Sequence, residues 1–313
     1  MARPIRGCRK WLFFGCLGCL ALLVQLTIIS SILFGVAWYR AKNESVEKRQ
    51  LTPALPSFDI ERWRDDTLAG EVVDEPPAGT IILDLQHSTF RIRPAAQGEP
   101  LRVEAEFDTT SYGLTESFDA GVDGTGWTYE VSFERTAGSY LLTTLKELVS
   151  GSRPKVKIYL PTDLPFDLEL DVAQGGAEVE LGGLWLTSAD IEFLQGGGAV
   201  EISDPMVAPV EYFGIGFTQG GGAIEGIANA SPSRLDVGFN MGGGYVDLYG
   251  AWLGDSEITI DQTMGGATVR LPRDVIIRGL GRSGLRPPLE TEIAPPVLTI
   301  TASSSMGEIE FIN

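Results

Sequence analysis

The sequence of 313 residues predicts an all-β chain: a single-stack β-solenoid of ~21–24-residue repeats, preceded by one N-terminal transmembrane helix. Three observations support this prediction. Glycine runs recur at near-constant intervals, apolar residues alternate with polar ones on both sides of those runs, and one long apolar stretch lies near the N-terminus. The composition, with 38 glycines and 21% charged residues, favours short strands and tight turns over long helices.

The apolar stretch from Trp11 to Trp38 predicts the helix. Its 28 residues, at ~1.5 Å each, exceed the roughly 30 Å hydrocarbon core of a bilayer. Four bases precede it, so the positive-inside rule predicts a cytoplasmic tail (1–10), a transmembrane helix (11–39) and an extracytoplasmic remainder at the cell membrane. A cleaved signal peptide is the alternative, because Gly35–Ala37 offers a small-x-small site.

The rest of the chain divides into a linker and a β domain. Residues 40–78 are polar and interrupted by prolines, which indicates a linker or stalk. Residues 79–313 are the predicted extracytoplasmic β-repeat domain. Apolar–polar alternation predicts its first strands at 80–86, 89–93, 101–107, 127–134 and 156–160, and helical spacing predicts one helix at Ser139–Val149.

The repeat begins near Asp167. Its markers each precede two or three glycines at intervals of 21, 24, 22 and 23 residues; they are Gln174, Gln195, Gln219, Met241 and Met264. Apolar residues form columns two, four and six residues before the marker and five after it, which is typical of stacked strands with one buried face. The glycines allow a bend with positive φ between two strands. Parity places the markers on the inward face, so the three glutamines are expected to be buried, with their amides bonded to one another or to the backbone of the turn.

The segments QGGGAVEI, QGGGAIEG, MGGGYVDL and MGGATVRL resemble those of the bacterial toast-rack or putative-adhesin β-repeat domains. The likeness extends to Val156–Asp163 and Val269–Ile277, which share an apolar strand ending in Leu-Pro-x-Asp, and covers about residues 79–313. It implies a β-solenoid, frequently membrane-tethered and sometimes associated with envelope-stress systems. It implies no catalytic residues.

Residue counts exclude several kinds of chemistry. All three cysteines (Cys8, Cys16 and Cys19) precede the β domain, and His87 is the one histidine, so neither a disulfide in that domain nor a multi-His zinc site is expected. No cofactor and no metal is predicted. Residues 43–313 carry 18 of the 24 bases against all 42 acids, a balance of −24, so nucleic acid is not an expected partner.

One acidic row is a candidate interaction face. It lies six residues after each marker and comprises Glu180, Glu201, Glu225 and Asp247, followed by Arg270 in the last repeat. In a stacked sheet these side chains would lie roughly 5 Å apart on the solvent face. A solvated face screened by salt is one interpretation, and weak binding of divalent cations or of a basic partner is the other.

These observations predict a structural or interaction protein, adhesin-like or envelope-associated, whose partner is an envelope component or a membrane protein. An accessory role in envelope-stress sensing is an alternative that follows from the resemblance alone. A glycan-active β-helix enzyme is the second alternative, and it requires carboxylates converging ~5–10 Å apart across a cleft. Because the acids form regular solvent-facing columns, no catalytic residue and no enzymatic activity are predicted.

Overall fold

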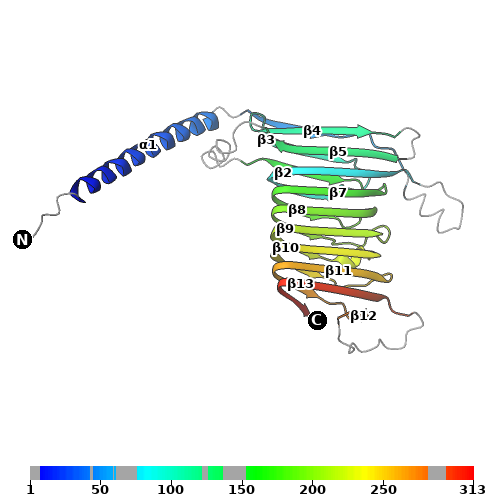
Figure 1. Cartoon of the computed structure of the whole chain (residues 1–313). Helices are drawn as coiled ribbons and strands as arrows, with labels where there is room; N and C mark the ends of the chain where they lie inside the picture. Colours follow the sequence, from blue (N-terminus) through cyan, green and yellow to red (C-terminus); the bar gives the residue numbers. More distant parts are fainter. Residues whose placement is uncertain are drawn as a thin grey trace, which may run out of the picture. The chain divides into compact units, whose positions relative to one another are not determined.

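The computed structural model describes residues 8–42, 45–58, 60, 76–121, 126–136, 153–280 and 294–313. The chain forms two units, residues 1–46 with 136–153 and residues 47–135 with 154–313. The first unit contains the helix α1, Cys8–Lys42, of 35 residues (Figure 1). The second unit contains the β-sheet.

Helix α1 covers the range 11–39 in which the sequence predicts a helix, and that helix is confirmed. Its predicted role as a transmembrane span is not supported. Within the described part of the chain, no helix combines the length and the apolar character needed to cross a membrane.

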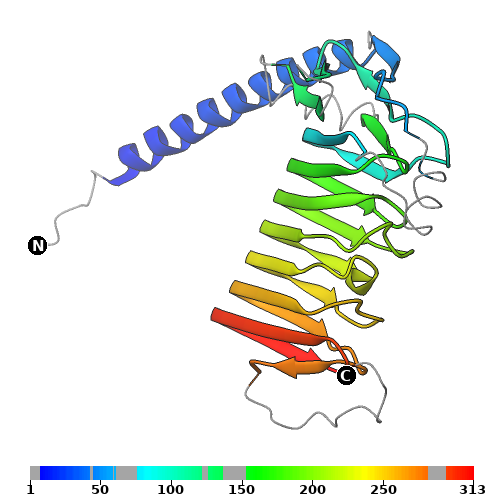
Figure 2. The ribbon, with the colours of Figure 1, turned by 90° about the vertical axis from the view of Figure 1, so that its right-hand side faces the viewer.

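The second unit is mostly β, and its strands form one 13-stranded sheet in the order β1-β3-β6-β2-β7-β8-β9-β10-β11-β13-β12, with β5 pairing β2 and β4 (Figures 1 and 2). The strands are β1 Val46–Leu51, β2 Ala78–Pro94, β3 Arg102–Asp108, β4 Tyr112–Asp119, β5 Gly126–Arg135, β6 Lys155–Leu160, β7 Phe166–Glu180, β8 Leu186–Glu201, β9 Tyr212–Glu225, β10 Arg234–Asp247, β11 Ser256–Arg270, β12 Ile276–Arg278 and β13 Val297–Ile312. One short 3₁₀ helix, η1, spans Ile227–Asn229.

The strands predicted ahead of the repeats are present. Those expected at 80–86 and 89–93 form one strand, β2, with a bulge at His87, whose φ of 61° is unusual for a non-glycine residue. Three strands were not predicted: β4, the short β12 and, inside the expected linker 40–78, β1. Strand β1 escapes detection because five of its six side chains are exposed, so that it shows no alternation. The helix expected at 139–149 lies outside the described residues.

The repeat strands β7, β8, β9, β10, β11 and β13 pair in parallel, and equivalent positions of successive repeats face each other. Every residue of the predicted inward columns is buried. One hydrophobic cluster extends from Ile81 of β2 to Ile300 of β13. The predicted core is therefore confirmed, and it forms by burial of matched side chains on neighbouring strands.

Each repeat is a single strand that bends at the first glycine after its marker. These five glycines, with φ between 124° and 141°, are Gly175, Gly196, Gly220, Gly242 and Gly265. At these bends, the backbone of one strand packs directly against the backbone of the neighbouring strand. A Cβ added to Gly196 would lie 1.8 Å from the carbonyl oxygen of Gly175, and one on Gly220 would lie 1.6 Å from that of Gly196. Both the dihedral angle and the space therefore require glycine at this position.

The side chains two residues before the marker form an aromatic ladder in three consecutive strands. The ring of Phe193 stacks on Phe217 at 4.8 Å and 5°, and Phe217 stacks on Phe239 at 5.2 Å and 6°. All three rings are buried. The predicted layering of these three phenylalanines is therefore confirmed.

The third residue after each marker is complementary to this ladder. A Cβ on Gly198 would lie 2.2 Å from Cε1 of Phe193, and the same distance separates the equivalent glycine and phenylalanine in β9 and in β10. In β7, where Val172 replaces the phenylalanine, the residue at the third position is Ala177. The glycine triplets thus serve two purposes: the first glycine bends the strand and the third makes room for a ring.

The prediction that the marker glutamines are buried is wrong. Gln174 is half-buried, and Gln195 and Gln219 are exposed. The alternation holds through Leu194, which is 42% exposed as expected for an outward side chain, and it ends at Gln195, because the chain enters the bend there and the marker no longer turns inward. The expected amide bonding is confirmed for one pair, since Nε2 of Gln174 donates to Oε1 of Gln195 at 2.9 Å.

Candidate functional site

The predicted acidic row lies on neighbouring strands of the sheet. Glu180 pairs with Glu201, and Glu201 with Glu225, in the parallel register. Glu201 and Glu225 are exposed, whereas Glu180 and Asp247 are half-buried. Glu180, Glu201 and Glu225 therefore occupy one register position on three neighbouring strands, and Asp247 ends the next strand, β10.

Both ends of this row have polar partners. Oε1 of Glu180 accepts hydrogen bonds from the backbone N–H of Gly182 at 2.7 Å and from the backbone N–H and hydroxyl of Ser203. At the other end Arg270 lies 3.2 Å from Asp247. The carboxylates at the two ends of the row, Glu180 and Asp247, are therefore already engaged within the chain. Only the two central carboxylates, Glu201 and Glu225, are exposed for binding a partner.

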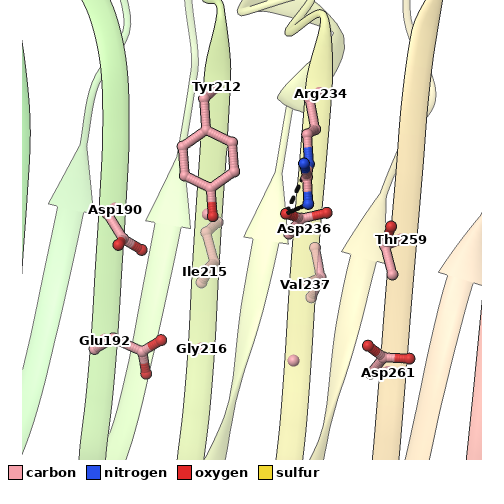
Figure 3. Close-up of a pocket in the computed structure, with 12 residues that line it drawn as sticks. Asp190, Glu192, Tyr212, Ile215, Gly216, Arg234, Asp236, Val237, Thr259 and Asp261 are labelled. Atoms are coloured by element: carbon pink, nitrogen blue, oxygen red, sulfur yellow. Dashed lines mark hydrogen bonds and ion pairs between the residues drawn. The ribbon is translucent and has the colours of Figure 1, made fainter.

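A second acidic surface lies on the N-terminal halves of the repeat strands, where a hollow of about 300 Å³ opens between β8 and β11. Asp190 and Glu192 of β8 form one wall, and Thr259 and Asp261 of β11 form the other (Figure 3). The side chains of β9 and β10 that lie between these walls include Tyr212, Arg234 and Asp236, which line the same hollow.

Glycines make the floor of the hollow. Gly216 of β9 pairs with Glu192 on one side and with Gly238 of β10 on the other, and Gly238 pairs with Asp261. The carboxylate of Glu192 leans over Gly216, where a Cβ would lie 2.2 Å from its Oε2. A Cβ on Gly238 would meet nothing within 4 Å. The missing side chains thus lower the surface between the two acidic walls.

The hollow contains four carboxylates and one guanidinium. Nη2 of Arg234 lies 2.7 Å from Oδ2 of Asp236, and the guanidinium stands 5.9 Å from the centre of the Tyr212 ring. The other oxygen of Asp236, Oδ1, is buried and has no hydrogen-bond partner among the described residues. The site therefore presents more acceptors and negative charge than its own donors satisfy.

Carboxylates also crowd together at the β8 wall. Asp84, Asp171 and Glu192 occupy the same register position on β2, β7 and β8. Burial raises the pKa of Glu192, and the charges of Asp190 and Asp171 raise it further. Burial likewise raises the pKa of Asp171, with added repulsion from Asp84 and Asp190. In both groups the ionised form is disfavoured in the folded chain.

This crowding predicts a pH-dependent effect of Glu192→Gln. A carboxyl whose pKa is raised by folding contributes stability below its unfolded pKa and loses that contribution as the pH rises through the folded value. The variant should therefore have a higher Tm than the parent chain at pH 7, and the difference should disappear below about pH 4, where the parent residue is protonated. Thermal melts across this range measure the effect; a Tm difference independent of pH would contradict it.

This hollow was not predicted from the sequence, although the sequence contains a signal for it. Position three before the marker reads Asp171, Glu192, Gly216, Gly238 and Asp261 in successive repeats, so two glycines interrupt an acidic row. The two glycines predict a hollow only when the register of the strands is known, because the register places the five positions side by side. Within the described residues, no group of three or more His, Cys, Asp or Glu side chains is arranged to hold a metal ion.

No protein-family model matches the chain, and no curated protein matches it. Among solved structures, the chain is similar to a "putative cell adhesion protein" from Clostridium sporogenes, with 10% identity, a TM-score of 0.36, and coverage of 85% of this chain and 99% of that one. It is also similar to a "putative adhesin" from Bacteroides fragilis, with 11% identity, a TM-score of 0.33, and coverage of 86% and 97%.

Proposed function

We propose that this chain is an adhesin-like interaction protein, without enzymatic activity, that binds a partner through the carboxylate-lined hollow. In this proposal the repeats are the coils of a β-solenoid, and the in-register pairing of β7 to β11 supports that interpretation. Such a stack holds the side chains of four neighbouring strands at fixed spacing. A scaffold of this kind suits recognition of a surface better than closure around a substrate.

The observation that carries the proposal is the excess of acceptors in the hollow. Ionised carboxylates accept hydrogen bonds and cannot donate them, so a complementary ligand must bring N–H donors and positive charge. Lys and Arg side chains of a protein partner meet both needs. We therefore propose that the partner is an envelope protein with a basic surface.

Binding of a lysine-rich peptide to the full chain tests this proposal. Glu192→Gln should weaken binding on the order of threefold, since one charge pair at a partly exposed site contributes up to about 1 kcal/mol. Affinity should also fall with added salt. The matched control is Glu201→Gln, which removes the same charge from the other acidic row and should leave the affinity unchanged. Equal losses in both variants would mean that net charge alone, and not the hollow, attracts the peptide.

The proposal includes a location outside the cytoplasm. This part rests on the sequence, on the bases that precede the apolar stretch Trp11–Trp38 and on the acidic character of the rest of the chain. Protease added to intact cells should degrade residues 79–313 if the domain is exported. Protection of that domain in intact cells, with degradation after lysis, would refute the location without touching the binding result.

A further inference from the structure

Three methionines occupy the same position, directly before the glycine bend, on three neighbouring strands. Met241 pairs with Met264 in the register of β10 and β11, and Met264 pairs with Met306 in the register of β11 and β13. The chain contains only five methionines, so most of them lie in this one column. The strands that carry them are direct neighbours in the sheet (Figure 1).

These side chains are not part of the core. Met241 is 37% exposed and Met306 is 65% exposed, while Met264 between them is half-buried. The bend does not require methionine, because the same position in β7, β8 and β9 is glutamine, with the same glycine after it. An exposed row of three apolar side chains, where the fold accepts a polar one, calls for a reason other than packing.

The spacing suits a shared ligand. Neighbouring strands lie about 4.8 Å apart. The backbone of the central methionine therefore lies at that distance from the backbone of one methionine on each side. Methionine has three rotatable bonds, which allows the outer sulfurs to lean toward the central one. Three sulfurs around one ion, with metal–sulfur bonds of roughly 2.3 Å, would be about 4 Å apart. This separation is close to the spacing between Met264 and each of its two neighbours. The outer strands lie about 9.6 Å apart, so the side chains of Met241 and Met306 must lean inward to bring their sulfurs together.

We propose that Met241, Met264 and Met306 form a binding site for a soft monovalent metal ion, Cu(I) or its analogue Ag(I). Thioethers are soft ligands that select Cu(I), while hard cations prefer oxygen. A thioether carries no proton to lose, so this site binds metal without the pH dependence of imidazole or carboxylate ligands. Met264 is paired in the register with both other methionines and is the ligand on which the site depends.

The test is a competition between the full chain and a coloured Cu(I) chelator, bathocuproine disulfonate, with ascorbate present to keep copper reduced. Cys8, Cys16 and Cys19 are replaced by serine in every sample, because thiolates would bind Cu(I) elsewhere in the chain. The parent chain should withdraw one Cu(I) from the chelator. Met264→Gln should weaken that affinity at least about tenfold, with Met241→Gln and Met306→Gln losing less.

The controls keep folding separate from binding. Glutamine is the natural residue at this position in three repeats, so the Gln variants should retain the thermal stability of the parent chain. Gln195→Met places a methionine in the same register but away from the column, and it should not change the affinity. Affinity should be the same at pH 5 and pH 7. The proposal is overturned by a parent chain that fails to compete, by equal affinity of the Met264→Gln variant, or by loss of binding at pH 5.

Discussion

Gly220→Ala is expected to destabilise the fold by about 3 kcal/mol or more. The φ of 128° at this residue lies in a region that costs a side chain about 1–3 kcal/mol. In addition, the new Cβ would lie 1.6 Å from the carbonyl oxygen of Gly196, so the bend of one strand must move away from the next. Displacing packed backbone adds about 1–3 kcal/mol. Chemical denaturation of the two proteins measures the difference.

The matched control for this change is Gly238→Ala. Gly238 lies in the next repeat strand, β10, where an added Cβ would meet nothing within 4 Å. Because alanine restricts the unfolded chain more than glycine does, this variant should be unchanged or more stable by about 0.5 kcal/mol. If both variants lost the same stability, the bend geometry would not be what requires glycine at residue 220.

The second large effect is a coupling between Phe193 and Gly198. Gly198→Ala alone should cost about 1–3 kcal/mol, because its Cβ would lie 2.2 Å from the Phe193 ring and the ring cannot move without leaving its stack on Phe217. Phe193→Val alone should cost about 3 kcal/mol through the cavity that it leaves. The double variant restores the Val and Ala combination found in β7 as Val172 and Ala177.

The double variant should therefore be no less stable than Phe193→Val alone, which corresponds to a coupling energy of about 1–3 kcal/mol. A full double-mutant cycle by denaturant melts measures this coupling. Strictly additive losses would show that the third glycine occurs in all three ladder strands for a reason other than the space that the ring occupies.

The core of this protein could be predicted from the sequence because it depends on the alternation of apolar and polar residues along each strand. Side chains two, four and six residues before each marker alternate between faces of an extended strand, and repetition at a near-constant interval indicates which strands stack. The burial of Phe193, Phe217 and Phe239 follows from that pattern. The same reasoning failed at Gln195, because a bend resets the alternation and its exact start is not encoded by parity.

Only the tertiary structure showed that outward side chains of β8 to β11 form a hollow. Glu192, Gly216, Gly238 and Asp261 are separated by 22 to 24 residues along the chain, and only the register of four parallel strands makes them a hollow. The Met column is visible in the sequence as a repeated letter, but its meaning depends on the exposure of Met241 and Met306 at the bend. Periodicity determines the inward face since burial demands matched apolar columns. The outward face is under no such demand, and its chemistry emerges when neighbouring strands are brought side by side.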